Sequence, residues 1–84
     1  MDRYLIETSH DEVDCYLNLN EIHAMGFLHN FDWGCKDGVH CGWAIINAEN
    51  KAQARMVIPS LSRDTARVVR LSKFDEEKLK ELHS

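Results

Sequence analysis

The segment from residue 31 to residue 46 constrains the fold more than any other part of the chain. It carries two stretches rich in strand-forming residues, with the dipeptide Asp37-Gly38 between them. Asp-Gly is a strong signal for a two-residue β-hairpin, because a type I′ turn needs positive φ at both central positions. The segment therefore predicts a hairpin whose strands cover residues 30–35 and 39–47.

Hydrophobic spacing and capping residues predict the elements around this hairpin. Ser9 and Glu12 form a capping-box pattern, and Gly26 and Pro59 are typical of helix ends. The remaining elements are a strand over 3–8, a helix over 11–25, a helix opened by Glu49 or Asn50, a strand over 65–73, and a short final helix capped by Ser72 or Asp75. The predicted stripe of the first helix consists of Val13, Tyr16, Leu17, Asn20 and Ala24, and Leu19 and Ile22 widen it.

The predicted order of elements is β-α-β-β-α-β followed by a terminal helix. This order is typical of the ferredoxin-like α+β fold, in which a four-stranded antiparallel sheet carries two helices on one face. A chain of 84 residues is long enough for one such domain, so we expect residues 1–84 to form a single ferredoxin-like domain.

Composition and charge exclude several classes of protein. Hydrophobic residues make up 44% of the chain, which is enough for a packed core. Residues 1–50 have a net charge of −7 and residues 51–84 of +3, so the total of −4 argues against a nucleic-acid partner. There is no apolar run of the roughly 20 residues that a membrane span needs. Three cysteines and no secretory pattern predict a cytoplasmic location.

The predicted third strand is apolar on both faces at its C-terminal end. Cys41, Trp43 and Ile45 point one way, whereas Ala44 and Ile46 point the other. The two helices can cover only one face, and an exposed apolar face usually marks an interface. We expect a homodimer through the open face, with Trp33, Trp43 and Ile45 as interface or ligand-contacting residues; the terminal helix and a small ligand are the alternatives.

The hairpin also carries the candidate metal ligands. With a two-residue turn, Cys35 lies opposite His40, with Cβ atoms about 5 Å apart. A thiolate and an imidazole at that distance could bind nickel, zinc or copper, or form an activated thiol. A three-residue loop would instead bring Cys35 to the face of Cys41 and Trp43 and exclude His40. The register of the hairpin decides which of Cys35, His40 and Cys41 share a face, and the sequence leaves that register open.

Ordinary structural roles are the competing interpretation of these residues. Two ligands are too few for a structural zinc site, which takes four. Cys15 is expected to be a small buried side chain of the first helix. The other histidines are scattered along the sequence: His10, His23, His29 and His83.

A second group of residues has the composition of a small catalytic site. Asp32 precedes Trp33, and a carboxylate in an apolar surrounding can act as a base with a raised pKa. The catalytic candidates are Asp32, His40 and Cys35. The alternative function is therefore a small cofactor-free enzyme, and the sequence does not decide whether the protein is an enzyme.

Four segments carry a resemblance to known proteins. They are RYLIE near the start, the hairpin from Trp33 to Trp43, NKAQAR before Pro59, and RVVRLSKF. Together they resemble small ferredoxin-like proteins of unknown function that are grouped with the dimeric α/β-barrel proteins and with a nickel-binding ferredoxin-like family.

This resemblance implies a dimer formed through the open sheet face, with a transition metal or small ligand, or an isomerase or monooxygenase activity without a cofactor. Trp33 and Cys41 match the hairpin of the family, whose metal-binding histidines have no assigned counterparts in this sequence. The stretch CGWAIINAENKAQARMVI is also similar to an RNA-recognition motif, but Val39 and Cys41 stand where that motif has stacking aromatic residues.

Overall fold

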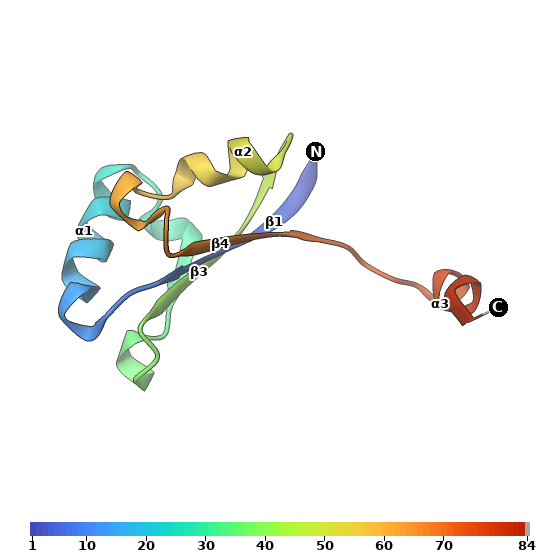
Figure 1. Cartoon of the computed structure of the whole chain (residues 1–84), viewed down its shortest axis with the longest axis horizontal. Coiled ribbons are helices and arrows are strands. Elements are labelled where there is room, and N and C mark those ends of the chain that lie inside the picture. The colour runs from blue at the N-terminus through green and yellow to red at the C-terminus, as the bar shows by residue number, and fades with distance from the viewer. Residues whose placement is uncertain (84) are drawn as a thin grey trace.

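The chain folds into a four-stranded antiparallel sheet with helices, as the computed structural model shows for residues 1–83, apart from the side chains of Leu61 and His83 (Figure 1). The α+β class and the order of elements agree with the sequence prediction. The strands are β1 (Asp2–Ser9), β2 (Phe31–Trp33), β3 (Cys41–Ala48) and β4 (Ala66–Leu71), and the helices are α1 (Cys15–Ala24), α2 (Lys51–Ala54) and α3 (Glu76–His83). Short 3₁₀ turns lie at Glu12–Asp14, Leu28–Asn30, Cys35–Asp37, Arg55–Val57 and Ser60–Ser62.

The sheet has the strand order β2-β3-β1-β4, and all neighbouring strands are antiparallel. Ile6 of β1 lies opposite Ala44 of β3 and Val68 of β4. Because opposed residues share a face, these three side chains point to the same side of the sheet. Helices α1 and α2 cover that side, which we call the covered face (Figure 1).

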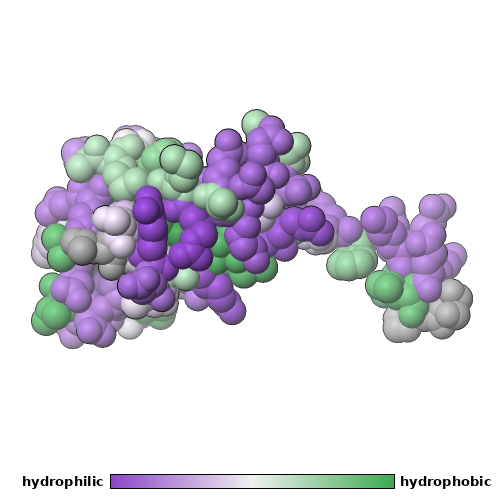
Figure 2. Space-filling view, turned by 45° about the horizontal axis from the view of Figure 1, so that its top comes forward, coloured by the Kyte–Doolittle hydropathy of each residue, from purple (hydrophilic) through white to green (hydrophobic). Residues whose placement is uncertain are grey.

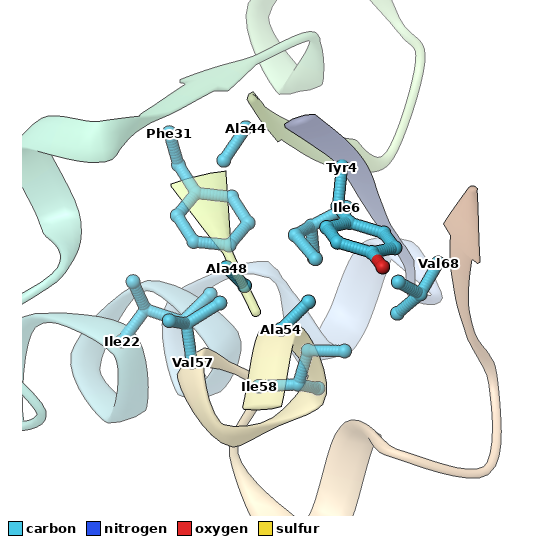
Figure 3. Packing of buried hydrophobic residues seen from close by; sticks show 10 residues of the cluster. All are labelled: Tyr4, Ile6, Ile22, Phe31, Ala44, Ala48, Ala54, Val57, Ile58 and Val68. Carbon is cyan, nitrogen blue, oxygen red and sulfur yellow. The ribbon is translucent and has the colours of Figure 1, made fainter. Parts of the chain in front are cut away.

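The core lies between the covered face and the helices. Ile6 from the sheet, Ile22 from α1 and Ile58 after α2 are fully buried and belong to one cluster (Figure 3). Burying a side chain of this size contributes roughly 1.5–3 kcal/mol, so these contacts position the helices on the sheet. The other members of the cluster are Tyr4, Phe31, Ala44, Ala48, Ala54, Val57 and Val68.

Several helix boundaries follow the predicted local signals. Gly26 ends α1 with φ +84°, a left-handed conformation that suits glycine. Asn50 caps α2, since its Oδ1 accepts a hydrogen bond from the backbone N–H of Gln53 at 2.8 Å. Asp75 caps α3 in the same way through the N–H of Lys78, at 2.8 Å.

The beginning of the first helix differs from the prediction. The predicted capping box is wrong, because Ser9 is the last residue of β1 and the chain enters the helix after Asp11 through a 3₁₀ turn. The predicted stripe is also displaced, with Val13 and Tyr16 exposed. Leu19 and Ile22, which the sequence predicts to widen the stripe, do turn inward, and Cys15 and Asn18 join them at helical spacing.

The predicted two-residue turn of the hairpin is also wrong. Strand β2 ends at Trp33 and β3 begins at Cys41, and the connection contains the 3₁₀ turn Cys35–Asp37. Gly38 has φ +78°, but Asp37 does not have positive φ, so this is not a type I′ turn. The Gly34 carbonyl accepts hydrogen bonds from the N–H groups of both Asp37 and Val39. We call residues 34–40 the hairpin loop.

The face opposite the helices, the open face, carries Leu5, Trp43 and Ile45, which the strand register places together. Helix α3 does not cover it: the helix lies beyond the end of β4, apart from the sheet (Figure 1). Among the helices of residues 1–83, none combines the length and the hydropathy that crossing a bilayer requires.

Candidate metal centre

Two cysteines and two histidines meet where the N-terminal turn contacts the hairpin loop. His10 follows β1, Cys15 begins α1, and Cys35 and His40 lie in the hairpin loop. Their ligand atoms all lie within 4.8 Å of one another, and all four residues are half-buried. We refer to these four residues as the Cys2His2 cluster.

Cys15 stands at the middle of the cluster. Its Sγ lies 3.1 Å from Nε2 of His10, 3.1 Å from Nδ1 of His40 and 3.3 Å from Sγ of Cys35. The Sγ of Cys35 lies 3.4 Å from Nε2 of His10. Each side chain thus directs its sulfur or nitrogen toward a common point.

Pairing of β1 with β3 brings the two histidines together. Ser9 is the last β1 residue in the register and lies opposite Cys41. One residue beyond this pair, the backbone N–H of His10 donates a hydrogen bond to the carbonyl of His40 at 3.0 Å. The two histidines therefore leave adjacent strand ends, although 30 positions separate them in the sequence.

The second ring nitrogen of His10 contacts the backbone. Nδ1 lies 3.3 Å from the carbonyl oxygen of Thr8. A carbonyl oxygen can only accept a hydrogen bond, so this contact favours the tautomer with its proton on Nδ1. Nε2 is then left with a free lone pair directed at the two sulfurs, which is the arrangement of metal-binding histidines.

The electrostatic surroundings keep Cys15 protonated when no cation is present. Burial raises the pKa of its thiol to about 11, and the neighbouring Cys35, Glu12 and Asp14 add to the increase. A bound divalent cation would reverse this effect, because it stabilises the thiolate directly. The cluster therefore has the ligand types of a metal site.

An indole ring packs beside the cluster. The ring of Trp33 lies 6.1 Å from that of His10, measured between centroids. Gly42 permits this position: a Cβ there would lie 2.8 Å from the Trp33 ring and 3.0 Å from Oγ1 of Thr8. The small residue in β3 thus lets an aromatic side chain shield one side of the candidate site.

The dimensions of the cluster suit a tetrahedral ion. Bonds of about 2.3 Å to sulfur and 2.0–2.1 Å to nitrogen place the ligand atoms of zinc about 3.3–3.8 Å apart. Four of the six separations in the cluster lie between 3.1 and 3.4 Å, and all six lie within 4.8 Å. Only small side-chain movements would be needed to accommodate the ion.

The residues predicted from the sequence as metal ligands or catalytic groups lie in different parts of the structure. Cys35 and His40 belong to the cluster, whereas the buried thiol of Cys41 lies near the carbonyl of Gly42 and the hydroxyl of Ser9. Asp32 lies opposite Trp43 on the open face. It borders a cavity of about 330 Å³ together with Leu5, Asn30, Trp43, Ala44 and Ile45.

Trp33 lies on the covered face, because it is paired with Gly42 and not with Trp43. Asp32 and Trp33 consequently face opposite sides of the sheet. The expected open-face group is thus divided, with Trp43 and Ile45 on the open face and Trp33 beside the cluster.

Sequence reasoning missed His10 and Cys15 as candidate ligands. A signal was present: four residues separate His10 from Cys15, and four separate Cys35 from His40. The same spacing therefore occurs in the turn after β1 and in the hairpin loop, and each segment carries one cysteine and one histidine. This pattern indicates a shared site only once the two segments are known to lie at adjacent strand ends.

Comparisons of the chain with protein-family models, with curated proteins and with solved structures gave no match. The candidate function therefore depends on the geometry of the site.

Proposed function

We propose that the chain is a zinc-binding domain whose ligands are His10, Cys15, Cys35 and His40. The observation that carries this proposal is the convergence of four ligand atoms within 4.8 Å of one another. Two thiolates and two imidazoles form one of the common ligand sets of structural zinc. Two thiolates would also neutralise the charge of a divalent ion.

A structural role suits this ligand set better than a catalytic one. Four protein ligands complete a tetrahedral zinc site, whereas catalytic zinc keeps one position for water or substrate. The ion would connect the turn between β1 and α1 to the hairpin loop. The backbone joins these segments through the hydrogen bond between His10 and His40, and the metal would add a cross-link between their side chains.

Zinc is favoured over nickel and copper by ligand type and geometry. Divalent nickel and copper prefer square-planar or tetragonal sites, whereas a Cys2His2 tetrahedron is typical of zinc. Thiolate ligands must remain reduced, which favours a reducing compartment such as the cytoplasm.

We also propose that the domain belongs to the ferredoxin-like fold class. The strand order β2-β3-β1-β4 and the covering of one face by α1 and α2 support this assignment. A chain that alternates strand and helix in this way can place both helices on one face through right-handed crossovers.

The deciding experiment is metal analysis of the full chain, purified without a histidine tag under reducing conditions. We expect about one zinc per chain by elemental analysis and native mass spectrometry. Replacement of zinc by cobalt(II) should give intense visible absorption and a thiolate charge-transfer band, both typical of tetrahedral coordination by sulfur.

Matched variants test the ligand assignment. Cys15→Ser and His10→Ala should each lower zinc affinity by at least about tenfold, because each removes one of four ligands. Cys41→Ala and His23→Ala change the same residue types outside the cluster and should leave affinity unchanged. Metal-free protein that takes up no zinc, or equal losses in the control variants, would overturn the proposal.

A further inference from the structure

We propose that a cavity between α1 and the connection from α2 to β4 binds a guanidinium group on a short aliphatic stem. We call it the acidic cavity. A small alkylguanidine carries such a group, and so does an arginine side chain of a peptide. The inference does not depend on zinc, because His10 is the one described residue that the cavity shares with the Cys2His2 cluster.

The acidic cavity has the size of a small-molecule site. Its volume is about 390 Å³, and ligand pockets usually occupy about 300–1,000 Å³. Its walls come from the end of β1, from residues 14–21 on one side of α1, and from the connection that contains Ser62 and Thr65. The Thr65 hydroxyl lies 3.3 Å from the carbonyl oxygen of Ser9 and 3.2 Å from that of Ser62, so two of these walls are in contact.

Three carboxylates line the cavity, and no lysine or arginine among the described residues does. They belong to Asp11, Asp14 and Glu21. Asp11 and Asp14 stand at helix N-cap positions, but neither side chain forms a capping hydrogen bond. The ion pairs of the described side chains involve Glu7 and Asp2, so none of the three carboxylates has a cationic partner there. A cleft lined by one sign of charge attracts the opposite sign, so this cavity attracts a cation.

The buried side chain of Asn18 is a second and independent indication of a ligand. Asn18 lines the cavity and is only 5% exposed, and its Nδ2 donates a hydrogen bond to Oγ of Ser62 at 2.8 Å. Its Oδ1 is buried and has no hydrogen-bond partner among the described residues. A buried amide oxygen without a partner costs free energy, which a hydrogen-bond donor of the ligand would recover.

The helix dipole does not explain all of these groups. Acidic residues near a helix N-terminus are stabilised by the dipole, which is sufficient for Asp11 and Asp14. Glu21 lies in the last turn of α1, where the dipole disfavours a negative charge. A cation bound in the cavity would stabilise this carboxylate and would also donate to Oδ1 of Asn18, three residues before it.

The spacing of the carboxylates favours a guanidinium over a metal ion. Among the described residues, the Cys2His2 cluster is the one group of ligand atoms close enough for a metal, so Asp11, Asp14 and Glu21 do not meet at a point. A guanidinium presents five N–H donors in a plane and can reach separated acceptors, whereas an ammonium is a compact charge.

The surroundings of the cavity suit an aliphatic stem of limited length. Leu17 lines the cavity and is 53% exposed, so it can contact such a stem. On the face drawn in Figure 2, the end of the molecule away from α3 is largely hydrophilic, with small separate apolar groups. A polar ligand with a short stem fits this surface better than an extended apolar ligand.

Binding of n-butylguanidinium to the full chain, measured by NMR titration and calorimetry, tests the proposal. We expect a dissociation constant of about 1 mM or lower, with large chemical-shift changes at the side-chain amide of Asn18 and the backbone amides of residues 62–65. n-Butylurea has nearly the same shape but no charge, so it should bind at least about tenfold more weakly. A capped Gly-Arg-Gly peptide that binds more tightly than n-butylguanidinium would identify an arginine side chain as the natural occupant, and weaker binding would identify a free guanidine.

Matched double variants test the assignment of the carboxylates. Asp11→Asn/Glu21→Gln should raise the dissociation constant of n-butylguanidinium by at least about tenfold, because it removes two charged acceptors from the cavity. Glu12→Gln/Glu49→Gln also removes two negative charges, but neither residue lines the cavity. At physiological salt this control should change the dissociation constant by less than about twofold.

Three results would each overturn the proposal. They are the absence of chemical-shift changes at Asn18 with about 10 mM n-butylguanidinium, equal affinity for n-butylurea, and equal losses in the two double variants. Circular dichroism confirms that each variant is folded, and the comparison with n-butylurea uses the wild-type chain alone. A chain that binds n-butylguanidinium but no zinc would contradict only the metal assignment.

Discussion

The Sγ atom of Cys15 lies 3.3 Å from the Sγ atom of Cys35, and it connects the first residue of α1 to the hairpin loop. The two thiols are free, and both lie within 3.4 Å of Nε2 of His10. At this separation the pair can share a metal ion or be oxidised together. The following predictions depend on that relationship and on the packing that maintains it.

Oxidation of the metal-free chain should join these two cysteines. Hydrogen peroxide takes one hydrogen from each thiol, which gives one disulfide and two water molecules. Peptide mapping by mass spectrometry should find Cys15 linked to Cys35, with Cys41 still reduced because it is buried in another place. Zinc-loaded protein should react more slowly. A disulfide that includes Cys41 would contradict the described geometry.

Metal affinity should rise with pH. Burial and Cys35 raise the pKa of Cys15 to about 11, so its thiol is protonated at neutral pH in the metal-free chain. Zinc must displace this proton, and each thiol proton that is displaced contributes about a tenfold increase in apparent affinity per pH unit. Competition with a chromophoric chelator between pH 7 and pH 8.5 measures this slope. An affinity independent of pH would show that Cys15 does not bind as a thiolate.

Removal of the metal should lower stability and loosen two segments. Zinc at a thousand times its dissociation constant stabilises a folded chain by about 4 kcal/mol, provided that the unfolded chain does not bind it. Chelation should therefore lower the melting temperature. It should also speed hydrogen exchange at residues 11–14 and in the hairpin loop. In the doubly substituted chain His10→Ala/Cys15→Ser, added zinc should have no effect on either measurement.

Gly42→Ala should destabilise the chain through Trp33. The new Cβ would lie 2.8 Å from a ring atom of Trp33 and 3.0 Å from Oγ1 of Thr8, so the indole must move. Overpacking of this kind costs about 1–3 kcal/mol. Urea denaturation of the reduced, metal-free protein measures the loss.

A double-mutant cycle separates this clash from a general effect of alanine in β3. In a Trp33→Leu background the smaller side chain removes the clash, so Gly42→Ala should cost less than in the wild type. Equal costs in the two backgrounds would show that Trp33 is not the residue displaced.

Local sequence signals predicted much of the fold. Gly26, Asn50 and Asp75 mark helix boundaries, because each acts through its own backbone or through a residue three positions away. Alternation of apolar residues located the first strand, and strand-forming residues on either side of Asp37-Gly38 located the second and third. The capping box at Ser9 failed because pairing with Cys41 keeps Ser9 in β1.

The sequence by itself determined the α+β class, the order of elements, and Cys35 and His40 as residues of chemical interest. The tertiary structure decided which residues join them. His10 and Cys15 reach the hairpin loop because β1 pairs with β3 in a register that ends at Ser9 and Cys41. A register is a property of two distant segments and of the core they bury together, so no local pattern specifies it.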